Sequence, residues 1–258
     1  MTARFAVAGM GVFCPQFPNL VDWLKRSERA DPAEPTGELL DKRSRRRASP
    51  LTKAFADAYQ QALEQAGLAP EAVGSVFGSA LGEAGTMIGL LDQMWREGGA
   101  LSPMRFATSV HNAAAGVVSI ATRNEGFTTS LGADFDTPGM ALLEAMAMAT
   151  AHGQAVMVAC ADEAAPIDLV TDGRGWGFAS AAIALVEDGA AAAALPRITV
   201  PSLGTPSLAP PDLPAGLADN PQAGLLDLID SLARGQEGVL RLDRGRGRGY
   251  CVEITRPA

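Results

Sequence analysis

The order of strand-like and helix-like segments in this 258-residue sequence predicts an α/β fold, a three-layer α/β/α domain with a mixed sheet. Short apolar segments typical of strands alternate with longer segments whose apolar residues recur at helical spacing. Ala155–Glu163 (AVMVACADE) is continuously apolar up to its two final acidic residues, as expected for a strand that is buried on both faces of a sheet. Trp176–Gly189 is a further apolar strand, which we expect to run antiparallel to a neighbour.

The first part of the chain contributes most of these elements. Phe5–Val12 (FAVAGMGV) indicates a short buried strand with a turn at its glycines. Ser49 and Pro50 begin a helix that ends at Gly67, and its apolar residues fall on one face. We further expect strands at residues 75–81 and 127–133, and helices at residues 84–97, 112–123 and 138–153.

Beyond residue 195 the composition changes. Seven prolines lie between Pro196 and Pro221, which is typical of a linker. Gly224–Arg234 is predicted to be helical, and residues 238–255 are predicted to form a hairpin that turns at the Gly-Arg repeats. We therefore divide the chain into a domain at residues 1–195, a linker at 196–222 and a C-terminal helix and hairpin at 223–258, packed on the same domain.

Composition excludes several classes of function. The net charge of −8 argues against nucleic acid as a partner, and no apolar run approaches the ~20 residues of a membrane span. Three scattered cysteines and an N-terminus without signal-peptide layout predict a cytoplasmic protein with reduced thiols. Gly9 and Gly11 lack the third glycine of a dinucleotide fingerprint, and no metal-ligand spacing occurs, so we expect neither cofactor nor metal.

Several motifs occur in a characteristic order. They are VAGMGVF near the start, SVHNAAAG at residues 109–116, VMVACADE, and GWGFASAAIALVEDG at residues 175–189. This order resembles the N-terminal half of the β-ketoacyl synthases over residues 4–190. The resemblance implies a thiolase-like half-fold.

The resemblance narrows to one group of small proteins. RRRASPLTKA, VFGSALGE and FATSVHNAAAG, with the short total length, are similar to the chain-length-factor type. Such proteins accompany ketosynthases in type II fatty acid and polyketide systems, notably those that make aryl polyenes. The resemblance implies a non-catalytic subunit that forms a heterodimer with an active β-ketoacyl synthase and helps to shape its acyl-chain tunnel.

A ketosynthase needs a thiolate at a helix N-terminus, where the helix dipole lowers the pKa of the cysteine. When Gly139 and Gly153 are matched to the two glycines of the family's nucleophile helix, the cysteine's place falls at Asp136, or at Phe135 if the match is one residue off. Neither residue can form a transferable thioester. Asp136 also has a structural interpretation, with Thr137 as the N-cap residue of the next helix.

Condensing ketosynthases also use two histidines from a second half, for which this chain has no room. Its two histidines are His111 and His152. We expect His152 to lie at a helix C-terminus and His111 to serve packing or hydrogen bonding. No catalytic residues are therefore expected.

The resemblance also implies contact residues. The strand Phe127–Ala133 should pair with the equivalent strand of the ketosynthase. The residues of this expected interface are Phe127, Thr128, Thr129, Ser130, Leu131, Gly132 and Ala133. Ala113, Ala114 and Val117 should line the far end of the acyl tunnel, although small residues also allow close helix packing.

A basic run is conspicuous on this acidic chain. Its members are Lys42, Arg43, Arg45, Arg46 and Arg47. Such a run is often a solvated loop. The resemblance implies that it docks an acyl carrier protein, directly or through the partner.

Two other functions stay open at this point. The chain could be a small thiolase-fold acyltransferase or hydrolase that uses the thiol of Cys160 or Cys14. It could also be a homodimeric acyl-binding module without a ketosynthase partner.

Overall fold

The computed structural model describes residues 3–96, 99–167, 169–171 and 173–256. Within them the strands are β1 (Arg4–Phe13), β2 (Gly74–Gly78), β3 (Thr128–Leu131), β4 (Val156–Asp162), β5 (Ala179–Glu187), β6 (Arg197–Thr199), β7 (Ser202–Leu203), β8 (Gly238–Arg241) and β9 (Tyr250–Thr255). The α-helices are α1 (Leu20–Lys25), α2 (Lys42–Arg45), α3 (Pro50–Ala66), α4 (Ala84–Arg96), α5 (Pro103–Ala107), α6 (Ala113–Thr122), α7 (Thr137–His152) and α8 (Ala223–Ala233).

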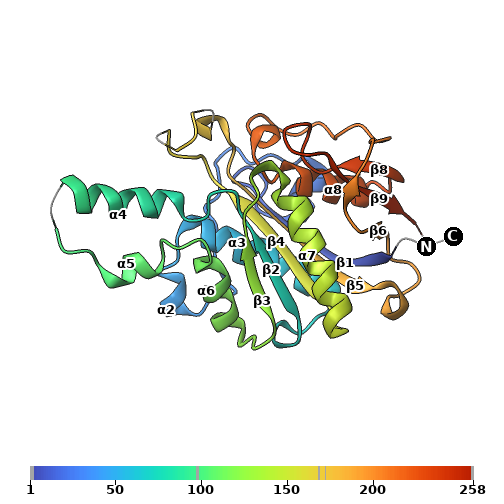
Figure 1. Cartoon of the computed structure of the whole chain (residues 1–258), viewed down its shortest axis with the longest axis horizontal. Helices are drawn as coiled ribbons and strands as arrows, with labels where there is room; N and C mark the ends of the chain where they lie inside the picture. Colours follow the sequence, from blue (N-terminus) through green and yellow to red (C-terminus); the bar gives the residue numbers. More distant parts are fainter. Residues whose placement is uncertain (1–2, 97–98, 168, 172, 257–258) are drawn as a thin grey trace.

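The described strands form one mixed sheet in the order β3-β2-β4-β5-β1-β6-β9-β7, with β8 paired to β9 (Figure 1). β2 runs parallel to β3 and β4, whereas β5 runs antiparallel to β4 and β1. Helices α3 and α6 pack on one face of the sheet, and α7 and α8 pack on the other. The predicted three-layer α/β/α fold with a mixed sheet is confirmed.

Local signals explain where the helices begin and end. The Ser49 hydroxyl accepts a hydrogen bond from the Thr52 N–H at the start of α3, and Gly67 closes the helix with a φ of 63°. Gly153 closes α7 in the same left-handed conformation, as predicted. β4 is buried along its whole length, as its apolar sequence predicts.

Gly9 and Gly11 do not form the turn that the sequence suggested, because both lie inside β1. A Cβ atom on Gly9 would come within 2.1 Å of the Ala62 carbonyl oxygen, and one on Gly11 within 2.0 Å of the Ala58 carbonyl oxygen. The two glycines therefore allow the backbone of α3 to approach the backbone of β1.

The proline-rich segment at residues 196–222 is not a separate linker. It contains β6 and β7, which join the sheet next to β1 and β9, and it buries Ile198 and Leu217. The C-terminal hairpin, formed by β8 and β9 as predicted, extends the same sheet. The three predicted regions thus form one continuous structure in the described part of the chain.

The glycine contact with α3 gives a test of this packing. Gly11→Ala should lower the free energy of unfolding by about 1–3 kcal/mol, because the new methyl group must push α3 away from β1. Urea unfolding followed by circular dichroism measures the loss. Gly189→Ala is the control, since a Cβ there meets nothing within 4 Å and stability should not change. Equal stability of both variants would contradict the close approach.

Candidate functional site

The N-terminus of α7 is the place where the sequence predicts a lost nucleophile. Asp136 ends a short 3₁₀ turn, Asp134–Asp136, and is itself the N-cap residue of α7. Thr137, predicted as the N-cap residue, is instead the first residue of the helix, and its hydroxyl donates to the Asp134 carbonyl oxygen. The Asp136 side chain accepts no hydrogen bond from the helix, so it does not cap α7 through its carboxylate.

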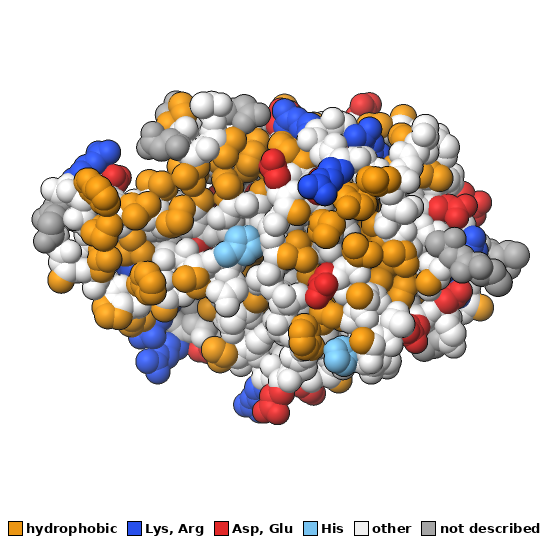
Figure 2. Space-filling model, in the orientation of Figure 1, with side chains coloured by type: hydrophobic (Ala, Val, Ile, Leu, Met, Phe, Trp, Pro, Cys, Tyr) orange, Lys and Arg blue, Asp and Glu red, His pale blue; other side chains and the backbone are white. Residues whose placement is uncertain are grey.

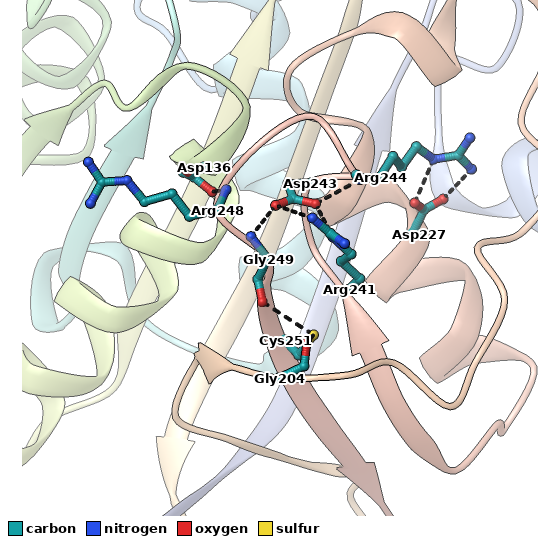
Figure 3. A network of polar contacts seen from close by, with 10 residues as sticks. Asp136, Gly204, Asp227, Arg241, Asp243, Arg244, Arg248, Gly249 and Cys251 are labelled. Atoms are coloured by element: carbon teal, nitrogen blue, oxygen red, sulfur yellow. Dashed lines mark hydrogen bonds and ion pairs between the residues drawn. The ribbon is translucent and has the colours of Figure 1, made fainter.

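The carboxylate of Asp136 is held by the turn between β8 and β9 instead (Figure 3). Its Oδ1 atom accepts a hydrogen bond of 2.8 Å from the Arg248 N–H. A Cβ atom on Gly247 would lie 2.3 Å from the same oxygen. Glycine at position 247 therefore lets the turn close over the N-terminus of α7.

Asp243 fixes the shape of this turn (Figure 3). Its carboxylate accepts hydrogen bonds from the Gly245 N–H at 2.8 Å and the Gly249 N–H at 2.6 Å, and it pairs with the Arg241 guanidinium. The side chain of Arg248 points away from this cluster. The turn is thus held at its base and presents a backbone N–H to Asp136.

The two candidate residues at the predicted nucleophile position and the thiols of Cys14 and Cys160 are poorly suited to carry an acyl chain. A carboxylate occupies the predicted nucleophile position, and Phe135, the other candidate, meets Trp176 edge to face and lies under the Arg246 guanidinium. The thiols of Cys14 and Cys160 are fully buried, and burial raises the pKa of each thiol far above its usual range. Both thiols are therefore protonated at neutral pH and out of reach of a thioester.

The two histidines do not form a catalytic pair in the described residues. The Nε2 atom of His111 lies 2.9 Å from the Ser79 carbonyl oxygen, so this ring joins the loop before α6 to the end of β2. His152 is the last residue of α7 and stacks on Phe127 with ring centroids 5.7 Å apart. It is separated from Asp136 by the whole helix, roughly 24 Å at the α-helical rise.

The strand predicted as a partner interface lies at the edge of the sheet. In the described residues β3 pairs with β2 alone. The carbonyl groups of Phe127 and Leu131 accept from β2, so by the alternation of a parallel strand the N–H groups of Thr128 and Ser130 point away from the sheet. The structure therefore leaves a row of backbone donors and acceptors open on β3.

The helices α4 and α5, here called the arm, project from the body of the molecule (Figure 1). Large apolar side chains on the same face of the molecule are exposed on the arm and near β3 (Figure 2). Trp95 is 82% exposed and Ile120 is 75% exposed. Further members of this apolar surface are Leu91, Met94, Met104, Phe106 and Phe127. The sequence analysis did not identify the arm as a candidate surface, although the apolar residues in 84–97 and 101–110 are the sequence signal for it.

The three residues of α6 that are predicted to line a tunnel differ in how deeply they are buried. Ala114 is buried in the core against α3, and Ala113 is buried as well, whereas Val117 is half-buried. A groove of 420 Å³ lies between α6 and β3, on a side of the helix next to that of the predicted tunnel residues. Its lining residues are Asn112, Ala115, Gly116, Ser119, Thr128, Thr129 and Ser130. Ser119 on α6 was missed because the sequence does not fix the rotation of the helix.

The basic run is partly helical rather than a loop. Lys42–Arg45 forms α2, whose N-cap residue Asp41 accepts hydrogen bonds from the N–H groups of Arg43 and Ser44. Arg45 is half-buried, and Lys42, Arg43, Arg46 and Arg47 are exposed. None of the ion pairs found among the described residues involves these five side chains. Their charges face solvent.

Two further features were searched for in the described part of the chain. No helix there has the length and apolar character needed to cross a bilayer. No group of three or more His, Cys, Asp or Glu side chains there could hold a metal ion.

Comparison with known proteins identifies the family of this chain. The family model described as "Beta-ketoacyl synthase, N-terminal domain" matches residues 21–196 of the 258. Among curated proteins, none matches the sequence at a significant level.

Solved structures share the fold at low sequence identity. A chain from the complex of the ketosynthase ApeO with its chain length factor ApeC, from Xenorhabdus doucetiae, has a TM-score of 0.73 and 20% identity, covering 99% of this chain and 100% of that one. A chain of AntDE:AntF, a type II acyl-carrier protein in complex with its ketosynthase, has a TM-score of 0.71 and 12% identity, with 100% of both chains covered. The ishigamide ketosynthase/chain length factor has a TM-score of 0.61 and 17% identity, covering 73% of this chain and 63% of that one. These neighbours confirm the thiolase-like fold.

The contact between Asp136 and the turn that joins β8 to β9 can be tested by substitution. Asp136→Ala removes the acceptor for the Arg248 N–H and should lower the free energy of unfolding by about 1–2 kcal/mol. Asp136→Asn keeps an oxygen acceptor at this position and should retain most of the stability. Thermal unfolding of the two variants measures the difference. If Asp136→Asn lost as much stability as Asp136→Ala, the charge and not the hydrogen bond would hold the turn.

Proposed function

Because this chain belongs to the β-ketoacyl synthase N-terminal domain family, we propose that it is a non-catalytic subunit of chain-length-factor type that pairs with an active β-ketoacyl synthase. The observation that carries the proposal is the N-terminus of α7, where the Asp136 carboxylate is bound by a backbone N–H in place of a nucleophile. The fold is kept while the chemistry of acyl transfer is lost. The pathway would be a type II fatty acid or polyketide system of aryl polyene type, working in the cytoplasm.

The open edge of β3 and the apolar arm support a heterodimer. An unpaired edge strand beside exposed Trp, Phe and Met side chains is a liability for an isolated protein. A ketosynthase strand paired to β3 would satisfy the outward N–H groups of Thr128 and Ser130 and cover the apolar surface. The neighbours ApeO with ApeC and the ishigamide proteins are ketosynthases with chain length factors, which supports a partner of this class.

The alternative of a thiol-dependent acyltransferase or hydrolase has less support. It needs a reactive thiolate near the surface, whereas Cys14 and Cys160 are buried and have raised pKa values. A stable acyl adduct on this chain in intact mass spectrometry would favour this alternative. A homodimeric acyl-binding module would use the same open edge without a ketosynthase.

We also propose that α2 and the residues after it attract the acyl carrier protein. Their exposed positive charges, from Lys42 to Arg47, have no ion-pair partner in the described residues, and a carrier protein is acidic. Long-range attraction between such surfaces acts mainly on the rate of association.

Assembly with a ketosynthase is the central test. The chain would be co-expressed with a candidate ketosynthase, and the affinity of the purified complex measured by analytical ultracentrifugation. Trp95→Asp and Phe106→Asp should weaken the complex at least about tenfold, because each places a charge in a buried contact. Both side chains are exposed in the single chain, so folding should be unaffected.

Leu203→Asp is the matched control for assembly. Leu203 is 66% exposed and lies on β7, at the opposite end of the sheet from β3. The complex should keep its affinity in this variant. Equal effects at both ends, or no complex with the wild-type chain, would contradict the proposed interface.

Carrier docking predicts a salt-dependent loss of turnover. Replacing Arg45, Arg46 and Arg47 with Glu should slow carrier-dependent extension several-fold at about 0.05 M salt and much less at about 0.5 M salt, since salt screens exposed charges. Steady-state kinetics of the assembled complex measures this. Lys25→Glu on α1 is the control for charge reversal elsewhere. Turnover that is unchanged at every salt concentration would leave the basic run as a solvated surface.

A further inference from the structure

The turn between β8 and β9, residues 242–249, covers the N-terminus of α7. Thr137, Pro138 and Gly139, the first residues of this helix, are all buried. A Cβ atom on Gly139 would lie 3.0 Å from the Cβ atom of Tyr250, which directly follows the turn. The free N–H groups of a helix N-terminus can stabilise an anion or a reacting carbonyl oxygen only where a ligand can reach them. Here the turn occupies the space in front of them.

An aromatic contact fastens the turn at this position. Phe135, which precedes Asp136, meets Trp176 edge to face, and the Trp176 side chain is buried. The Arg246 guanidinium, which comes from the turn, lies 4.8 Å from the centre of the Phe135 ring. The same guanidinium donates to the Asp219 carbonyl oxygen at 3.0 Å and lies 3.3 Å from the Asp219 carboxylate. Arg246 thus holds the turn over Phe135.

Other contacts that hold the turn do not involve Asp136 (Figure 3). Asp243 accepts hydrogen bonds from backbone N–H groups of the turn, and the fully buried Asp227 on α8 pairs with Arg244. The φ angle of Arg244 is 49°, a conformation that residues other than glycine rarely adopt. A turn that several independent contacts hold in this way is a fixed part of the fold rather than a mobile lid.

We propose that this turn is a stopper that keeps carrier-borne acyl chains away from the N-terminus of α7, so that position 136 stays unacylated even when it holds a thiol. The proposed function attributes the absence of acyl transfer to the carboxylate of Asp136, and the stopper adds a second, independent barrier. The identity of the excluded ligand rests on the proposed function, whereas the closure does not. In a complex with a ketosynthase, both barriers direct the acyl chain to the partner's thiol.

The test introduces a thiol at the covered position. An accessible thiol in Asp136→Cys would ionise readily at the helix N-terminus and react faster than an ordinary surface cysteine. A thiol under the stopper should instead react slowly. Ala151→Cys is the reference, because Ala151 is exposed at the other end of α7. The native cysteines are buried, so the wild-type chain provides a low background.

The rate of alkylation by iodoacetamide, in which the sulfur displaces iodide, is followed by intact mass spectrometry of the folded full chain. Asp136→Cys should be alkylated at least about tenfold more slowly than Ala151→Cys, because its thiol reacts only when the turn opens locally. Iodoacetamide is smaller than a pantetheine-bound acyl chain, so a site that is closed to this reagent is also closed to the chain. Equal or faster alkylation of Asp136→Cys would overturn the inference.

Loosening the turn connects the protection to the stopper. Arg246→Ala, added to Asp136→Cys, removes the contact over Phe135 and should raise the alkylation rate several-fold. Arg246 and Asp219 are both partly exposed, so this variant should stay folded, which circular dichroism checks. Arg234→Ala is the matched control, since it breaks an ion pair at the far end of α8 and should leave the rate unchanged.

The outcomes separate this inference from the proposed function. If the folded Arg246→Ala variant keeps the slow rate, and Asp243→Ala, which frees the base of the turn, keeps it as well, the turn is not the barrier and the inference is wrong. Alkylation is measured on the single chain, whereas assembly with a ketosynthase is measured separately. Failure of the stopper therefore leaves the proposed function standing, and failure of assembly leaves the closure of α7 standing.

Discussion

The buried carboxylate of Asp162 joins segments of the chain that are far apart in the sequence. It accepts hydrogen bonds from the Ser79 hydroxyl at 2.7 Å, the Ala80 N–H at 2.8 Å and the Gln222 side-chain amide at 2.5 Å. The end of β4, the loop after β2 and the start of α8 therefore meet at one point. Burial raises the pKa of this carboxyl, and the donors around it oppose that effect. If one donor were lost, a buried acceptor would remain unpaired, which is costly.

Helix α8 fixes the position of the turn between β8 and β9, which binds Asp136 at the N-terminus of α7. A Cβ atom on Gly224 would lie 1.6 Å from the Leu242 carbonyl oxygen, so α8 and the end of β8 are in direct backbone contact. The ion pair of Asp227 with Arg244 connects the same helix to the turn between β8 and β9. The turn is therefore fixed by α8 and places the Arg248 N–H on Asp136. The environment of Asp136 is thus set by the packing of the C-terminal region.

The face of the molecule that carries the edge of β3, the arm and the groove beside α6 is open, in contrast to the buried contacts around Asp162 and α8. The edge of β3 offers backbone groups, the arm offers apolar side chains, and a groove with polar lining residues lies between α6 and β3. These features adjoin a buried core, which includes almost all of α8. In our proposal the core provides the stability of the chain, and the open face binds a partner.

The sequence by itself determined the type and approximate bounds of most elements, because caps such as Ser49 and Gly67 and the apolar pattern of β4 act locally. It also placed Asp136 at a helix N-terminus. Tertiary structure alone decided the partner of Asp136, since Arg248 lies 112 residues away. It also decided which residues of α6 face the groove and that residues 196–222 join the sheet. Those features depend on helix rotation and on contacts between distant segments, which a local pattern does not encode.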